Sequence, residues 1–272
     1  MTTATAGAPT VGTLLRAWRD RRRMSQLELA LRAGSSARHI SFIETGRSRP
    51  SREMILRLAD HLDVPVRERN ALLVAAGYAP HFPERPLGDP AMHELRACLE
   101  LLLRGHEPFP ALVVDGAYQV VAANRAVSLL LDGVAEELLV PPLNAMRLTL
   151  HPRGMAPRIR NYGQWRAHLL HQMERRPAAL RSAPLRAVHE EVSAYPPPDV
   201  PAEGRTDDCP VAPFALPLVI EHHGRTLSFI SAISAISTFN TPMDVTVSEL
   251  ALETFLPADP ETAAYLRETL TP

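Results

Sequence analysis

Hydrophobic residues along the first eighty positions recur every three or four residues, the spacing of an amphipathic helix. Val11, Leu14, Leu15 and Trp18 share one face of a helix beginning near residue 11. The same periodicity, interrupted by turn residues, continues as four further short segments up to Gly77. We therefore expect an all-α domain of five helices.

The second and third of these helices have their boundaries marked in the sequence. Ser25 and Glu28 form a capping box, which starts a helix. Gly34 can adopt the left-handed conformation that ends it. Ser35 is then expected to cap the next helix, which Gly46 ends. Two short helices joined by a tight turn make a helix-turn-helix, whose second helix enters the DNA major groove.

The outward face of that second helix is polar. Ile40 and Ile43 point inward at helical spacing, whereas Arg38, His39 and Ser41 remain outside. The alternative without DNA binding is a helical bundle whose basic face is simply solvated.

This region, over about residues 11–75, resembles the Cro-type repressors, also called the xenobiotic-response-element family. The shared residues are Ser25-Gln26, Leu29-Ala30, Ala33-Gly34, Ile40-Ser41, Glu44, Gly46-Arg47 and Pro50-Ser51. The resemblance implies a lambda-repressor-like domain with a buried ion pair between Arg19 and Glu44. It also implies a DNA-contacting set comprising Gln26, Ser36, Ala37, Arg38, His39, Ser41, Phe42, Arg47 and Arg49. Within this set we expect Arg38 to read a guanine edge, Phe42 to pack on a thymine methyl, and Gln26, Arg47 and Arg49 to hold phosphates.

Charge is divided unevenly along the chain. All 29 basic residues are arginine, and the net charge is −1. Residues 1–80 carry 13 arginines and 7 acidic residues, whereas residues 81–272 carry 16 and 23. A basic N-terminal region followed by an acidic remainder of the chain is consistent with DNA binding by the N-terminal region alone.

Proline marks the domain boundary. Four of the 26 prolines lie between residues 80 and 90, where a helix cannot continue. We therefore expect a flexible tail over residues 1–10, a DNA-binding domain over 11–78, a linker over 79–90 and a second domain over 91–272.

The second domain mixes helices and strands. Helices are expected over residues 90–104 and near 143–150, 159–175, 178–194 and 260–270. Leu102 is expected to be buried in the first of these. A further short helix is expected after Asn124, which would cap it. A hairpin with a two-residue Asp115-Gly116 turn and strands over 214–221, 226–239 and 245–256 complete the pattern. Together they predict an α+β domain with a mainly antiparallel sheet.

Several motifs of this half resemble the sensor domain of MmyB-like transcription regulators. They are residues 110–126, 143–154, 161–165, 237–250 and 253–262, and the junction at residues 75–80 also resembles that family. The resemblance implies a PAS-like fold that holds a small apolar ligand, fatty-acid-like in some members. Asn240 departs from the glycine that the family favours there.

An apolar cleft needs apolar walls and a few polar groups. The candidates for such a lining are Leu112, Val114, Met146, Leu148, Tyr162, Trp165, Arg166, Leu169, Phe214, Phe229, Ile230, Phe239 and Phe255. Any one of the apolar residues could equally be ordinary core. Arg166 and His168, which follow Trp165 in the same helix, could meet a carboxylate head group or lie on a solvated helix face.

Catalytic and metal sites are not expected. The chain has no GxSxG, P-loop or HExxH motif. His151, His168, His171 and the pair His222-His223 lack a cysteine or acidic cluster that would complete a zinc site, so we interpret them as surface histidines. We expect no cofactor other than a bound fatty acid or similar apolar molecule.

These features together predict a sequence-specific transcription regulator. We expect a homodimer on an inverted-repeat double-stranded DNA operator, with half-sites about one helical turn apart. We expect no membrane association and a bacterial cytoplasmic, nucleoid-associated location. The alternatives are a second domain that is a ligand-free protein-interaction and dimerisation module, or an enzyme fused to a DNA-binding head.

Overall fold

The chain folds as two compact units in a computed structural model, which describes residues 9–175, 182–198, 215–236 and 244–270. Among these, the first unit comprises residues 9–85 and 244–248, and the second comprises 86–236 and 249–270. The segment 244–248 therefore belongs with the N-terminal helices although it lies late in the sequence.

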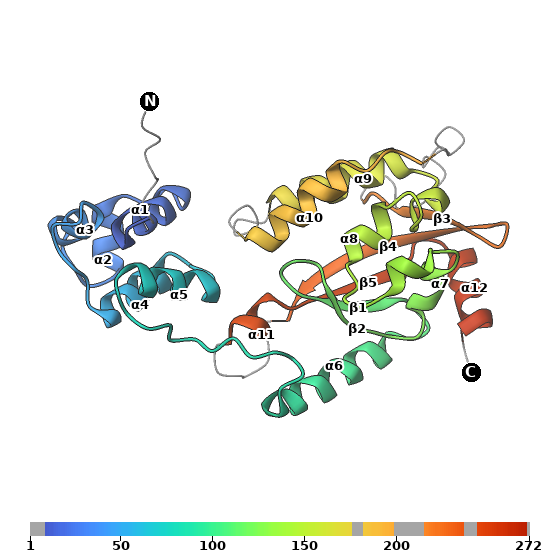
Figure 1. Ribbon diagram of the computed structural model, residues 1–272, viewed down its shortest axis with the longest axis horizontal. Coiled ribbons are helices and arrows are strands. Elements are labelled where there is room, and N and C mark those ends of the chain that lie inside the picture. Colours follow the sequence, from blue (N-terminus) through green and yellow to red (C-terminus); the bar gives the residue numbers. More distant parts are fainter. Residues whose placement is uncertain (1–8, 176–181, 199–214, 237–243, 271–272) are drawn as a thin grey trace. The chain divides into compact units, whose positions relative to one another are not determined.

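Five helices make up most of the first unit, as predicted. They are α1 (Val11–Arg21), α2 (Gln26–Arg32), α3 (Ala37–Glu44), α4 (Arg52–His61) and α5 (Val66–Ala75), to which most of the short α11 (Val245–Glu249) is added (Figure 1). Their core contains the fully buried Trp18, Ile40, Ile43, Leu58 and Leu72.

Serine and threonine side chains start four of these helices. Thr10, Ser25 and Ser51 each accept a hydrogen bond from a first-turn N–H of the helix that follows. The helix α3 is capped by Ser36 and not by Ser35, which corrects the sequence prediction by one residue. Since the Ser35 N–H donates to the carbonyl of Ala30 (2.8 Å), Ser35 closes α2 instead.

The second unit is built around one sheet of five strands. Its elements are η1 (Pro90–Met92), α6 (His93–Gly105), β1 (Ala111–Val114), β2 (Val120–Ala123), α7 (Val127–Leu131), η2 (Glu136–Leu139), α8 (Ala145–Leu150), η3 (Ala156–Arg158), α9 (Tyr162–Arg175), α10 (Ala183–Ser193), β3 (Leu218–His222), β4 (Arg225–Ala235), β5 (Ala251–Pro257) and α12 (Pro260–Leu270). The strand order is β2-β1-β5-β4-β3, and every neighbouring pair is antiparallel. The predicted α+β architecture with an antiparallel sheet is confirmed.

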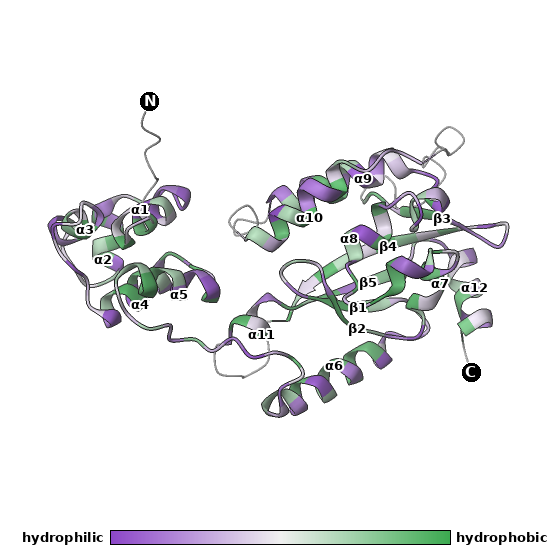
Figure 2. Ribbon diagram, viewed as in Figure 1, coloured by the Kyte–Doolittle hydropathy of each residue, from purple (hydrophilic) through white to green (hydrophobic). Residues whose placement is uncertain are grey.

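Helices cover the sheet. Figure 1 shows α6 along one side of the sheet and α7 to α10 on the other. Hydrophobic and hydrophilic residues alternate along α6 (Figure 2), which buries Leu95, Leu99 and Leu103. Leu102 is 39% exposed, so its predicted burial is wrong; it lies at the edge of that stripe and not at its centre.

The connection between β1 and β2 is longer than predicted. Val114 pairs with Val120, so five residues and not the Asp115-Gly116 pair form the turn. The Asp115 carboxylate accepts hydrogen bonds from the N–H groups of Ala117 and Gln119, and Tyr118 adopts a left-handed conformation (φ 62°). The aspartate thus organises a wider loop than the usual Asp-Gly hairpin turn.

Two further predictions need correction. The stretch 245–256 is not one strand: the short helix α11 precedes β5, and the side chain of Asp244 accepts from the N–H of Thr246 at its start. Asn124 does not cap α7. Its side chain instead accepts from the N–H of Ala111 and donates to the carbonyls of Leu103 and Phe109, which ties α6 to β1.

Candidate DNA interface and ligand cavity

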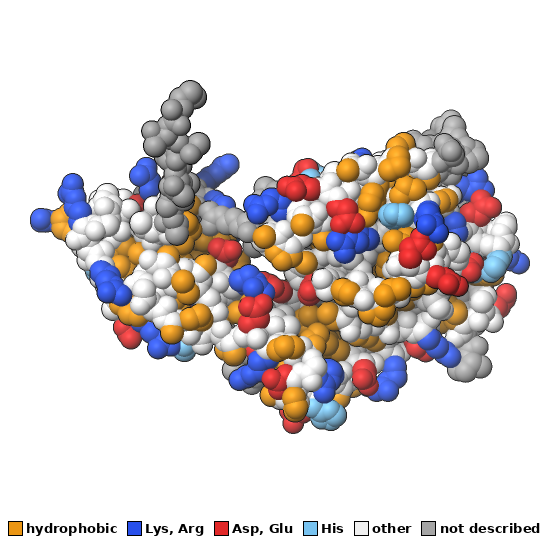
Figure 3. All heavy atoms as spheres, viewed as in Figure 1, with side chains coloured by type: hydrophobic (Ala, Val, Ile, Leu, Met, Phe, Trp, Pro, Cys, Tyr) orange, Lys and Arg blue, Asp and Glu red, His pale blue; other side chains and the backbone are white. Residues whose placement is uncertain are grey.

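The helix α3 presents a polar and cationic surface. Arg38 is exposed, and its guanidinium lies 5.2 Å from the ring centre of Phe42. Arg47 approaches the same ring at 5.9 Å. Because cations over an aromatic face are attracted by its quadrupole, Phe42 holds both arginines at the surface of α3. Figure 3 shows arginine side chains projecting from this unit.

A buried ion pair fixes α3 against α1. The Arg19 guanidinium binds the Glu44 carboxylate through Nε (2.7 Å) and Nη2 (3.0 Å), and the Glu44 side chain is only 3% exposed. The hydrogen bond to Glu44 raises the pKa of Arg19 above its ordinary value. The predicted pair is therefore present, with the bidentate geometry in which arginine and carboxylate bind best.

Two residues that were expected to contact phosphates make hydrogen bonds within the protein instead. The Gln26 side-chain amide donates to Glu44 (2.8 Å), which places it between α2 and α3. The Arg49 guanidinium donates to the Ala76 carbonyl (2.8 and 3.1 Å) at the end of α5 and lies over Tyr78.

The remaining predicted DNA contacts lie at the start of α3 or along it. Ser36 is exposed and its hydroxyl accepts from the N–H of His39 (3.1 Å), while the His39 ring contacts the hydroxyl of Ser35 (3.1 Å). Ala37 and Ser41 are partly exposed on the same helix. Ser36, Ala37, Arg38, Ser41 and Phe42 therefore lie at the start of α3 or along it, at least partly exposed, whereas Gln26 and Arg49 are hydrogen-bonded within the protein.

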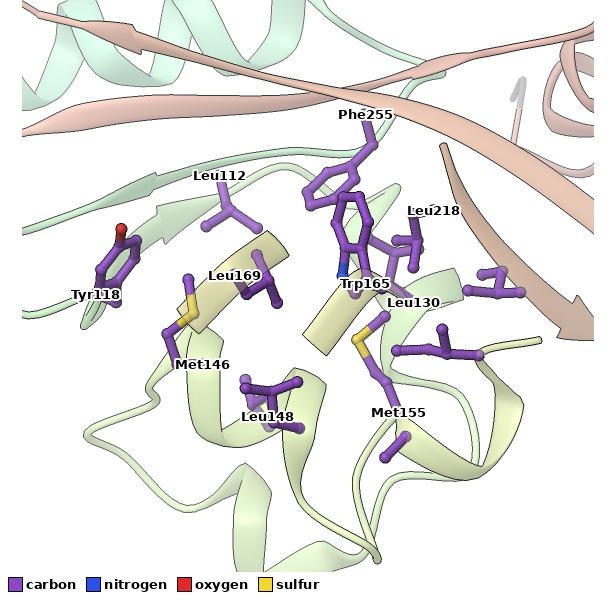
Figure 4. Packing of buried hydrophobic residues seen from close by; sticks show 14 of the residues in the cluster. Leu112, Tyr118, Leu130, Met146, Leu148, Met155, Trp165, Leu169, Leu218 and Phe255 are labelled. Atoms are coloured by element: carbon purple, nitrogen blue, oxygen red, sulfur yellow. The ribbon is translucent and has the colours of Figure 1, made fainter. Parts of the chain in front are cut away.

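An apolar cavity lies in the second unit between the sheet and the helices α7, α8 and α9. Its volume is about 80 Å³. It is lined by Leu112, Val120, Ala123, Val127, Leu130, Leu131, Leu143, Ala145, Met146, Leu148, Thr149, Met155, Trp165, Leu169, Leu218, Glu253 and Phe255. Figure 4 labels several of these side chains, with Met146, Leu148 and Met155 facing Trp165 and Leu169.

Three polar side chains reach this apolar wall. The indole Nε1 of Trp165 is buried and has no hydrogen-bond partner among the described residues. Glu253 is 4% exposed and accepts from the hydroxyl of Ser231 (2.9 Å), and Thr149 lies beside Met155. A buried donor without a partner carries a cost that a ligand's acceptor could remove.

The structure brings six of the thirteen sequence-predicted lining residues to the cavity. They are Leu112, Met146, Leu148, Trp165, Leu169 and Phe255. Five others lie away from its wall. Val114 and Phe229 are fully buried in the core, and Ile230 lies between the buried side chains of β4. The Tyr162 hydroxyl donates to the Leu150 carbonyl, and the Arg166 guanidinium donates to the Ser193 carbonyl. Phe214 and Phe239 lie outside the described residues.

Sequence reasoning missed the contribution of the α7 region and of Glu253. Val127, Leu130 and Leu131 follow one another at helical spacing and face the cavity from α7. The spacing of these three residues could have indicated the cavity, whereas nothing in the sequence around Glu253 marks it as a lining residue.

Comparison with family models assigns both units. Residues 15–69 match a helix-turn-helix family, and residues 95–268 match the MmyB-like transcription regulator ligand binding domain. No curated protein matches the chain. Among the described residues, no helix is long and apolar enough to cross a membrane.

Proposed function

Because this chain belongs to the family of MmyB-like transcription regulators, we propose that it is a homodimer whose affinity for an inverted-repeat operator responds to a small, fatty-acid-like ligand. DNA binding and a ligand-binding domain follow from the family itself. The ligand class, the dimer and the residues that act are the proposal.

The single observation that carries the ligand proposal is the cavity with its unpaired indole N–H. Seventeen side chains line it, and nearly all are apolar. Trp165 Nε1 is the buried donor that would bind a carboxyl or carbonyl oxygen of the ligand.

Cavity size limits what can enter. Since one water needs roughly 10–15 Å³ by the same measure, about 80 Å³ admits only a short molecule unless the walls move. Met146 and Met155 are the flexible walls, because unbranched thioether side chains change rotamer at low cost. A longer acyl chain would bind by displacing them.

DNA reading would fall to α3. Arg38, ordered over Phe42, would contact a guanine edge, and Arg47 would contact a phosphate. One copy of α3 contacts only a few base pairs, so two copies would bind two half-sites. The symmetry of the dimer would then match the symmetry of the operator.

The first experiment is native mass spectrometry of the freshly purified chain, followed by solvent extraction of anything bound. We expect a dimer carrying a stoichiometric small apolar molecule. An empty dimer that stays empty after incubation with a panel of fatty acids would favour the protein-interaction module instead.

Two variants connect any bound mass to the cavity. Ala123→Phe narrows the cavity from an exposed position on β2 and should abolish retention of the ligand. Val121→Phe, on the same strand but absent from the lining, is the matched control. Trp165→Phe should retain apolar ligands and weaken binding of acids. Equal retention by Ala123→Phe and wild type would contradict the proposal.

The DNA surface is tested by selecting preferred sequences from a random duplex library with the full chain. Arg38→Ala should cost about 1–3 kcal/mol and relax the preference at one position. Arg47→Ala should weaken all sequences alike and reduce the salt slope by about 1. Arg16→Ala, an exposed arginine on α1, is the control. Unchanged selection by Arg38→Ala would refute the assignment of α3.

A further inference from the structure

We propose that Asp132, His222 and His223 form a binding site for a divalent transition-metal ion of the zinc class. Asp132 directly follows α7, and the two histidines lie at the turn between β3 and β4. One ligand atom from each residue lies within 4.8 Å of the other two.

The distances fit two ligands of one metal better than they fit hydrogen bonds. His222 Nδ1 and His223 Nε2 each lie 3.5 Å from Asp132 Oδ2. Hydrogen bonds between such atoms are about 2.7–3.2 Å long. Two ligands about 2.0–2.2 Å from one tetrahedral zinc ion are about 3.4 Å apart. Imidazole nitrogen and carboxylate oxygen are ligands that zinc accepts in proteins.

His222 supplies an independent sign that a ligand is missing. Its side chain is 6% exposed, and its Nδ1 has no hydrogen-bond partner among the described residues. A buried polar atom left unpaired is costly. A metal ion shared with Asp132 would satisfy this nitrogen.

The hairpin that carries the histidines has a constrained backbone. His223 and Gly224 form its two-residue turn with φ values of 48° and 74°. A two-residue turn with positive φ at both positions favours asparagine and glycine, and histidine is among the other residues that adopt positive φ more often than most. This conformation places the 70% exposed His223 side chain beside Asp132.

The neighbouring arginines are already engaged. Arg158 donates to the carbonyls of Leu129 and Leu130, and Arg160 pairs with Glu221 (2.7 Å). These residues line the same open pocket of about 420 Å³, so the metal's fourth position would face solvent and hold water or a small anion. Sequence reasoning interpreted the two histidines as surface residues because Asp132 lies ninety residues earlier.

The test uses the untagged full-length chain after treatment with a chelator. Calorimetric titration with Zn²⁺ should show one site, and Co²⁺ should give the visible absorption of a tetrahedral complex. Asp132→Asn and His223→Asn replace exposed side chains, so both variants should fold. Each should weaken zinc binding by at least about tenfold, since even outer-shell changes cost 10–100-fold.

His93→Asn, an exposed histidine at the start of α6, should leave zinc binding unchanged. His222→Asn should also abolish the cobalt spectrum, with circular dichroism reporting whether that variant folds. No zinc binding by the wild-type chain would overturn the proposal. Binding that survives both Asp132→Asn and His223→Asn would also overturn it, because the metal would then lie elsewhere.

Discussion

Removing the Glu44 carboxylate is the sharpest test of how the DNA-binding unit is held together. In Glu44→Ala, the Arg19 guanidinium loses two charge-assisted bonds (2.7 and 3.0 Å), and the Gln26 amide loses its acceptor (2.8 Å). The Arg19 side chain is only 11% exposed, so water replaces these bonds poorly. We expect the free energy of unfolding of this unit to fall substantially.

The magnitude follows from what Arg19 retains. Breaking a buried pair by removing one partner costs about 3–5 kcal/mol. Arg19 keeps its bond to the Met24 carbonyl (2.8 Å) and its contact with Asp20 (2.9 Å), which places the loss near the lower limit, about 3 kcal/mol. Glu44→Gln preserves one acceptor and should cost about 1–2 kcal/mol.

Tryptophan fluorescence isolates the relevant unit. The chain has two tryptophans, so a Trp165→Phe background leaves the buried Trp18 as the reporter of the N-terminal helices. Urea unfolding followed through Trp18 gives the free-energy difference. The control is Arg32→Ala, which breaks an exposed pair with Glu28 (2.8 Å) and should cost about 0.5 kcal/mol or less. Equal losses for Glu44→Ala and Arg32→Ala would refute the reasoning.

Two further predictions concern packing and pH. Gly12→Ala should destabilise the same unit in the Trp18 assay, since an added Cβ would lie 2.4 Å from the carbonyl oxygen of Ile43, whereas Gly88→Ala meets no atom within 4 Å and should be silent. The hydrogen bond from Arg147 lowers the pKa of Glu191, so this carboxylate stabilises the second unit above the unfolded pKa of about 4.3 and loses that contribution as pH falls through its lower folded value. Glu191→Gln should therefore flatten the acid side of the stability profile measured by urea unfolding; an unchanged slope would contradict this.

The N-terminal unit was predictable because its signals are local. A serine cap, a glycine with positive φ and three-to-four spacing each act within a few residues. The single error, Ser35 in place of Ser36, arose because adjacent serines are equivalent in sequence. Their hydrogen bonds distinguish them: the Ser35 N–H donates to the Ala30 carbonyl, whereas the Ser36 hydroxyl accepts from the N–H of His39.

The second unit was predictable in class but not in its site. The five residues from Ala251 to Phe255 are all buried, so no alternation marks where the strand begins or which side chains face the cavity. Pairing decides this: Leu112 lies opposite Glu253, which brings both to one face. Such register, like the meeting of Asp132 with His222, depends on contacts distant in sequence.

The segment before β5 packs in the first unit and continues directly into a strand of the second, so the two units are joined there as well as through the linker. Val245 is 1% exposed, clusters with Val66 and Phe82, and its N–H donates to the Pro83 carbonyl (2.8 Å). Ten residues later, Phe255 stands in the cavity wall. A ligand changes DNA affinity only through different affinities for two conformations. Because only Leu250 separates α11 from β5, the strand that carries Phe255 is joined directly to residues packed within the N-terminal unit.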